Sequence, residues 1–197
     1  MNKETYTGLK DGVYFISIDE NGNKEYTPLT QETESAAAQT KYIGIKMGDR
    51  AIAVTLQDLP GDRDGELELI PYGKNKCPRT GDHYTYDDEK DEWRYNAFED
   101  FNGEENTKRL MECGCQILLP EGTWIPSIGQ LGIMMMNAGK LNRALELAGG
   151  KPMKYWYWSS TENSATLAWY VLFSYGYVNG NYGKHNSGAV RAVAAFN

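Results

Sequence analysis

The C-terminal part of the chain places the strongest constraint on the fold. Aromatic and β-branched runs without helical periodicity occur in "YWYWSSTE" (155–162), "LAWYVLFSYGYV" (167–178) and "AVRAVAAF" (189–196), and "SYGYVNGNYGKHNSG" (174–188) is rich in glycine, asparagine and tyrosine. Such runs favour strands, and Gly and Asn favour the turns between them. The pattern predicts several late strands joined by loops of high aromatic content.

The rest of the chain predicts two hairpins and two helical regions. Apolar runs flank turns at 12–27 and 41–56, which indicates hairpins. Acidic residues precede basic ones over 102–112, as in a helix. Ser127 and Gln130 form a capping box, and helical spacing continues over 140–150. The expected fold class is α+β, with residues 1–40 as an N-terminal hairpin extension and 41–197 as the main domain.

The acidic charge restricts the partners. The chain has 197 residues and a net charge of −7, whereas a phosphate backbone requires a basic surface, so nucleic acid is not an expected partner. No apolar run is long enough for membrane insertion. The start "MNKETYTGLKDG" has no apolar signal region, which predicts synthesis in the cytoplasm.

The cysteines and histidines give no catalytic or metal pattern. Cys77, Cys113 and Cys115 are an odd number without a visible signal peptide, which predicts free thiols in a reducing compartment. Cys113 and Cys115 lack zinc-site spacing, so no metal and no cofactor are expected. His83 and His185 lie in polar loops without a nucleophile pattern, and no catalytic residue is predicted.

Several motifs together resemble a known family. They are "GTWIPSIGQLGIMMM", "LNRALELAGG", "YWYWSSTE", "AWYVLFSYGYV" and "VRAVAAF", in that order over residues 122–196. The combination resembles C-type-lectin-like domains of gut Bacteroidetes and their phages, in particular the variable proteins of diversity-generating retroelements. In those systems a reverse transcriptase errs at adenines and rewrites the C-terminal end of a target gene.

The resemblance implies a fold and a mode of action. It implies a C-type lectin fold with paired N- and C-terminal strands, two helices and a ligand-binding face within a variable region at 155–197. It also implies display on a virion or cell surface, with a host surface protein or a glycan as the partner. The chain lacks a Glu-Pro-Asn sugar motif, so calcium-dependent sugar binding is not expected.

Codon arithmetic gives an internal test of diversification. Adenine-directed changes at AAC or AAT codons keep a pyrimidine in the third position and never produce Lys, Glu, Gln, Met or Trp. Over residues 163–189 only Trp169 and Lys184 belong to that set, so both would be fixed scaffold positions. Aromatic strands and Gly-Asn loops also avoid charged residues for structural reasons, which is the competing interpretation.

The residues themselves predict a binding face. Tyrosine offers a rigid contact surface, and Ser, Gly and Asn offer adaptable hydrogen bonds, as in antibody loops. Strand alternation puts Trp169, Val171 and Phe173 on one side and Tyr170, Leu172 and Ser174 on the other. The predicted ligand-binding residues are Asn163, Thr166, Leu172, Ser174, Tyr175, Tyr177, Asn179, Asn181, Tyr182, His185 and Ser187.

The remaining late residues are predicted to form the scaffold. Trp169, Val171, Phe173 and Val178 would support the face, and Trp156, Trp158, Val190 and Val193 would lie in the core. Arg191 is expected to be structural, with Glu162 as a candidate partner.

Three functions compete. The first is a non-enzymatic receptor-binding protein diversified by a retroelement. The second is a fixed lectin or surface-fibre tip protein. The third is a relative of formylglycine-generating oxidases, which use a late cysteine pair to bind copper. This chain has no cysteine after Cys115, which argues against the third.

Overall fold

The computed structural model describes residues 8–30, 34–61, 66–71 and 84–196. They form an α+β protein whose strand pairs are mostly antiparallel. The chain divides into two compact units, and neither is continuous in sequence. The first contains the described residues within 1–58, 133–153 and 193–197, and the second those within 59–132 and 154–192.

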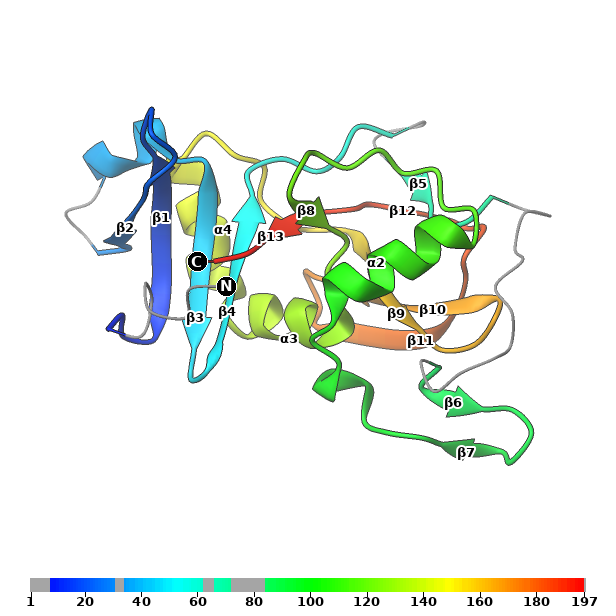
Figure 1. Ribbon diagram of the computed structural model, residues 1–197. Helices are drawn as coiled ribbons and strands as arrows, with labels where there is room; N and C mark the ends of the chain where they lie inside the picture. The colour runs from blue at the N-terminus through cyan, green and yellow to red at the C-terminus, as the bar shows by residue number, and fades with distance from the viewer. Residues whose placement is uncertain (1–7, 31–33, 62–65, 72–83, 197) are drawn as a thin grey trace. The chain divides into compact units, whose positions relative to one another are not determined.

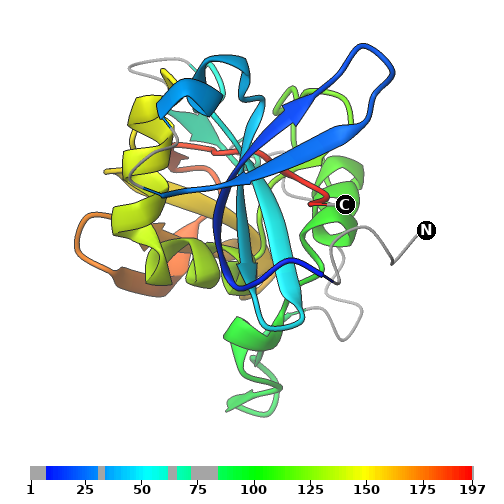
Figure 2. The ribbon, with the colours of Figure 1, turned by 90° about the vertical axis from the view of Figure 1, so that its left-hand side faces the viewer.

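The first unit is built on an antiparallel sheet. Its strands lie in the order β2 (Lys24–Pro28), β1 (Gly12–Ile18), β3 (Tyr42–Met47), β4 (Arg50–Thr55) and β13 (Val193–Ala194) (Figures 1 and 2). Helix α4 (Ala138–Leu147) and the short helix η1 (Glu34–Gln39) complete this unit. Both predicted hairpins are confirmed, because β1 pairs with β2 and β3 pairs with β4.

Strand β1 pairs on both sides, which makes the N-terminal hairpin part of the main sheet. β1 also pairs with β3, with Phe15 opposite Ile43, so the first hairpin is a continuous part of the sheet. The sequence suggested instead an extension over 1–40. The C-terminal strand β13 pairs with β4 rather than with β1. Beyond β13, the Phe196 ring stacks on Tyr26 at 5.0 Å, which ties the end of the chain to the first hairpin.

The second unit carries the late strands. β11 (Tyr177–Gly183), β10 (Leu167–Leu172) and β9 (Trp156–Glu162) form an antiparallel sheet in that order (Figure 1). Helix α2 (Gly103–Glu112) and the short helix η2 (Ala97–Glu99) precede them. The short strands of this unit are β5 (Leu67–Glu68) paired with β12 (Ser187–Gly188), β6 (Tyr86–Asp87) paired with β7 (Glu92–Trp93), and β8 (Thr123–Trp124).

The helices follow the local signals closely. Helix α2 covers the predicted span, and Gly114 has a φ of 102° just beyond it, a conformation that favours glycine. The capping box is confirmed: the Ser127 N–H donates to Gln130 Oε1 at 2.9 Å, and the Gln130 N–H donates to Ser127 Oγ at 3.3 Å. The second helical region, however, is two helices, α3 (Ile128–Met136) and α4, with Asn137 between them. The described residues thus contain three α-helices rather than two.

The hydroxyl residues of "WSST" (158–161) are structural. Their side chains are buried in the second unit. Thr161 Oγ1 donates to Asp100 Oδ2 at 2.6 Å and accepts the Ile128 N–H at 2.9 Å. The Ser160 N–H donates to the Pro126 carbonyl at 2.8 Å. These bonds fix β9 to the segment that begins α3, so the motif positions the sheet.

The cysteine prediction is wrong for Cys113. Cys113 is disulfide-bonded, whereas Cys115 is buried with a free thiol. Burial raises the pKa of the Cys115 thiol, with the Ile117 backbone hydrogen bond acting in the opposite direction, so this thiol stays protonated and unreactive at neutral pH. Cys77 lies outside the described residues. A disulfide is favoured in an oxidising environment, which removes the argument for a reducing compartment.

Candidate ligand-binding face

One side of the late sheet carries a continuous series of aromatic rings. The register places Tyr170 opposite Trp158, and Leu172 opposite both Trp156 and Tyr177. Residues directly opposite on neighbouring strands share a face. The ring centroids are 4.4 Å apart for Trp156 and Tyr170, and 4.2 Å apart for Tyr170 and Tyr182. Trp158 joins the series through Tyr182 at 5.1 Å, and Tyr177 joins it through Trp156 at 5.8 Å.

This series runs from the core to the surface. Trp158 is 1% exposed and belongs to the hydrophobic core with Leu110, Ile125 and Val190. Tyr170 is buried as well, and Trp156 and Tyr182 pack partly buried against the same core. Tyr177 is 51% exposed at the outer end. The face therefore has a rigid inner layer and an outer layer that a ligand can reach.

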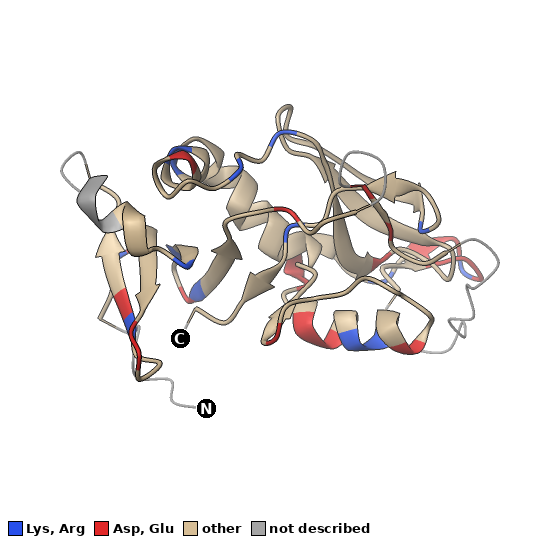
Figure 3. Ribbon diagram, turned by 90° about the horizontal axis from the view of Figure 1, so that it is seen from above, with Lys and Arg blue, Asp and Glu red and all other residues tan. Residues whose placement is uncertain are grey.

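The turn between β10 and β11 presents one further tyrosine. The Tyr175 N–H donates to the Leu172 carbonyl at 3.2 Å, which closes the turn. Gly176 follows with a φ of 65°, which favours glycine there. The Tyr175 side chain is 83% exposed. Strands β9, β10 and β11 contain a single charged residue, Glu162, and aromatic residues are frequent in all three. Figure 3 shows the charged residues of the chain by colour.

The tyrosine hydroxyls nearer the core remain hydrogen-bond donors. Burial raises the pKa of Tyr170, and the neighbouring Tyr182 and Tyr177 add to the effect. Burial also raises the pKa of Tyr182, with Glu66 contributing. Both hydroxyls therefore stay protonated at neutral pH. The Tyr182 hydroxyl lies 3.4 Å from the Ser187 carbonyl, beside a depression of about 510 Å³ lined by Glu66, Leu67, Glu68, Pro71, Gln116, Ile117 and Ser187.

The predicted ligand-binding residues fall into three groups by exposure. The exposed ones are Thr166, Ser174, Tyr175, Tyr177, Asn181, His185 and Ser187. The partly buried ones are Leu172, Asn179 and Tyr182. Asn163 is buried, so its side chain cannot contact a ligand directly.

Asn163 instead belongs to a polar chain behind the face. The Trp169 Nε1–H donates to Thr85 Oγ1 at 2.9 Å, and Thr85 Oγ1 donates to Asn163 Oδ1 at 3.0 Å. Asn163 Nδ2 donates in turn to Asn181 Oδ1 at 3.1 Å. The structure thus connects the side chains of Asn163 and Asn181 with Trp169. The Asn181 backbone N–H also donates to Asn179 Oδ1 at 2.6 Å, and Asn179 Nδ2 donates to the Tyr177 hydroxyl at 3.2 Å.

Simple alternation misplaced two aromatic residues of β10. Trp169 was expected on the scaffold side and is only partly buried, whereas Tyr170, on the opposite side, is buried among aromatic rings. The register shifts between Ala168 and Tyr170, on both neighbouring strands. Such a bulge changes the local direction of side chains, and sequence periodicity does not reveal it. Val171 and Phe173 are buried, and Val178 is partly buried.

Gly180 makes room for Trp169. A Cβ atom at position 180 would lie 2.9 Å from the Trp169 ring. We expect Gly180→Ala to displace the indole and break its hydrogen bond to Thr85, at a cost of about 1–3 kcal/mol. The Trp169 indole N–H signal in NMR measures the displacement of the ring, and urea unfolding measures the loss of stability.

The control is Gly139→Ala, because a Cβ atom at position 139 would meet nothing within 4 Å. Gly176→Ala is not a suitable control, because Gly176 has a positive φ. An unchanged indole signal in Gly180→Ala would contradict the prediction.

Lys184 is buried, as expected of a scaffold residue. Its partner is Glu162, which the sequence had suggested as a partner of Arg191. Its ammonium group forms a buried ion pair with Glu162 and donates to the Ala165 carbonyl at 2.9 Å. Arg191 is fully buried. Burial lowers the pKa of Lys184 and raises that of Glu162, while the opposite charge of each partner counteracts both effects. The pair links β9 to the end of β11.

Two further observations concern other kinds of site. Within the part of the chain that the structure describes, no three His, Cys, Asp or Glu side chains gather in a way that could hold a metal ion. Among the same residues, no helix has the length and apolar character to cross a membrane.

Comparison with known proteins gives one structural relative to report. The chain is similar to a fimbrial protein from Bacteroides ovatus, with a TM-score of 0.55 and 17% sequence identity. The match covers 94% of this chain but 48% of the fimbrial protein, so the chain spans about half of its length. No protein-family model and no curated protein matches the sequence. The likeness extends to the fold alone.

Proposed function

We propose that the protein is a non-enzymatic surface protein that binds a macromolecular ligand through the sheet of β9, β10 and β11. The binding face is the outer end of the aromatic series, formed by Tyr175, Tyr177, Tyr182 and the adjoining Ser187. One observation carries the proposal: the exposed Tyr177 ring packs on Trp156, which belongs to a layer of mutually packed rings, and the exposed Tyr175 lies in the turn directly before Tyr177. The ligand is a host surface protein or a glycan.

The energetics suit such a face. Tyrosine buries a large area while freezing few torsions, and truncation of an aromatic anchor often costs about 2 kcal/mol or more of binding free energy. Exposed positions tolerate substitution, usually within about 0.5 kcal/mol of stability. Substitutions in the outer layer can therefore alter which ligand the protein binds without unfolding the inner layer.

The proposal includes a C-type-lectin-like fold and diversification by a retroelement. Within residues 163–189, adenine-directed change cannot produce Trp169 or Lys184. The structure holds both side chains in place, since Lys184 pairs with Glu162 and the Trp169 indole donates a hydrogen bond to Thr85. Most of the predicted contact residues between 163 and 189 are exposed. Sequencing many copies of the locus tests this part: changes should cluster in these codons and spare positions 169 and 184. Evenly spread changes would contradict diversification.

A fixed surface-fibre protein is the second candidate. It is favoured by the likeness to a fimbrial protein and by the disulfide of Cys113, which suits an oxidising surface location. In this alternative the same tyrosines bind one constant partner. The sequencing experiment separates the two candidates, and the binding experiment below applies to both.

The test of the binding face is a double variant, Tyr175→Ala/Tyr177→Ala. Screening the wild-type protein against a glycan array and a panel of bacterial surface proteins would first supply a ligand. We then expect the double variant to weaken binding at least about tenfold, because two anchors are lost. Its free energy of unfolding should change by less than about 1 kcal/mol.

The matched control is Leu118→Ala, which removes another exposed apolar side chain of the same unit, 89% exposed. This variant should bind the ligand normally. Equal binding by the double variant and the wild type would exclude the proposed face, and detection of catalytic turnover would exclude the non-enzymatic assignment.

A further inference from the structure

A second group of aromatic side chains reaches the surface at the β6–β7 hairpin. The Trp93 ring is 56% exposed and lies 5.7 Å from the Trp169 ring. Tyr86 packs edge-on against Trp93 at 5.0 Å. Trp is enriched among the residues that dominate binding energy at protein interfaces. We call Trp93, Trp169 and Tyr86 the tryptophan patch.

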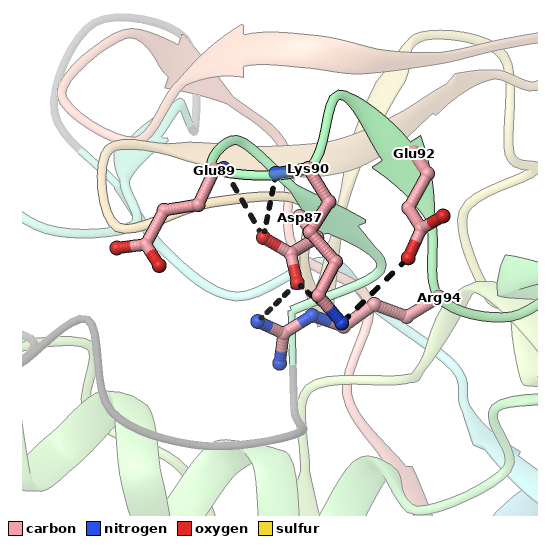
Figure 4. A network of polar contacts seen from close by, with 5 residues as sticks. All are labelled: Asp87, Glu89, Lys90, Glu92 and Arg94. Carbon is pink, nitrogen blue, oxygen red and sulfur yellow. Dashed lines mark hydrogen bonds and ion pairs between the residues drawn. The ribbon is translucent and has the colours of Figure 1, made fainter.

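The hairpin holds the tryptophan patch in a defined arrangement. Asp87 Oδ1 accepts the N–H groups of Glu89 at 3.1 Å and Lys90 at 3.3 Å, and Asp87 Oδ2 accepts from Arg94 Nη2 at 3.2 Å (Figure 4). Burial opposes ionisation of Asp87, but these hydrogen bonds and the nearby cations outweigh it and lower its pKa. Asp87 is thus ionised at neutral pH and cross-links the turn directly before Trp93.

The surroundings of the tryptophan patch are acidic. Residues 86–94 contain five acidic and two basic residues. The two basic side chains face carboxylates of the hairpin itself: Arg94 contacts Asp87, and Lys90 lies 3.8 Å from Glu92. Figure 4 shows the Glu89 carboxylate turned away from this network. The outward charge of the hairpin is therefore negative.

We propose that the tryptophan patch is a second docking surface, which binds arginine or lysine side chains of a basic segment in a partner protein. A cation over an indole face is attracted by the ring, and Trp is the best of the aromatic residues in this respect. The neighbouring carboxylates attract the same charge and raise its local concentration. Charge complementarity thus favours a cationic protein segment, and the same charge disfavours nucleic acid.

This surface is distinct from the tyrosine face. Trp169 and Tyr170 are consecutive in β10 but contact different sets of residues. Tyr170 stacks with Tyr182 on the tyrosine side, whereas Trp169 contacts Trp93 and Thr85. The inference therefore does not depend on the function proposed for Tyr175 and Tyr177.

The test uses the full chain and a pair of matched peptides. The probe is an acetylated peptide of alternating glycine and arginine, and its control replaces each arginine with uncharged citrulline. We expect the arginine peptide alone to shift the NMR indole N–H signals of Trp93 and Trp169, and added salt to weaken its binding. Maltooligosaccharide serves as a neutral sugar probe and should shift neither signal.

Variants separate the contributions of ring and charge. Trp93→Ala should weaken binding of the arginine peptide about tenfold. Glu89→Gln/Asp91→Asn removes two charges at similar shape and should weaken it several-fold, and the Tyr175→Ala/Tyr177→Ala variant should bind normally. Equal shifts with the citrulline peptide, shifts with the sugar, or no shift with any probe would each overturn the proposal. The indole N–H signal of Trp169 in the Trp93→Ala spectrum reports that the fold is intact.

Discussion

Replacing Lys184 with methionine is expected to lower the free energy of unfolding by about 3–5 kcal/mol. Both members of the ion pair are almost fully buried, since Lys184 is 1% and Glu162 is 3% exposed. Methionine fills a similar volume but removes the ammonium group that pairs with the Glu162 carboxylate, so that Arg109 remains as the cation acting on it. The protein must then bury a less compensated charge or protonate the carboxyl group. Urea unfolding at neutral pH measures the loss.

Two companion variants make this prediction specific. Lys184→Met/Glu162→Gln removes both charges, so it should recover much of the stability that Lys184→Met loses. Lys108→Met breaks an exposed pair with Glu104, whose groups are 3.0 Å apart, and should cost at most about 1 kcal/mol. If Lys184→Met and Lys108→Met cost the same, the buried pair does not stabilise the scaffold. Position 184 could then vary freely, contrary to the diversification hypothesis.

The sequence predicted those parts of the fold that local signals determine. Both N-terminal hairpins form because their turns join adjacent strands. Helix α2 ends two residues before Gly114, which has a positive φ, and α3 begins at the capping box of Ser127 and Gln130. The division of the helical region at Asn137 was missed, since a single residue separates the two helices. The composition of both compact units was also missed, because each gathers segments far apart in the chain.

The candidate site was predictable in composition but not in geometry. The exposure of Tyr175 and Tyr177 follows from a Gly-containing turn between apolar strands. The burial of Asn163 and Tyr170 does not, because it depends on the register shift in β10 and on contacts with Thr85, over 70 residues earlier. Trp93 directly follows the charged segment 87–92, and a run of charged residues usually indicates a solvated surface. Only the fold brings Trp93 to Trp169, so periodicity gave no signal for the tryptophan patch.

The inner aromatic layer should carry most of the stability of the late sheet, and Trp158→Ala tests this. We expect this variant to lose about 3–5 kcal/mol of unfolding free energy. The Trp158 ring packs against Tyr170 and Tyr182, and its Nε1–H donates to the Leu67 carbonyl at 2.9 Å. Gly188 lies beside the same ring, since a Cβ atom there would be 3.0 Å from Trp158 Nε1, and it supplies no side chain to fill the cavity.

Tyr175→Ala is the matched control in the outer layer and should cost no more than about 0.5 kcal/mol, since its side chain is 83% exposed. Urea unfolding of the two variants in parallel measures the difference. A sheet that bears a changeable binding face needs this contrast, because only a stable inner layer lets the outer residues vary independently. Similar losses for both variants would mean that the exposed tyrosines also hold the sheet together, and the separation of scaffold from binding face would fail.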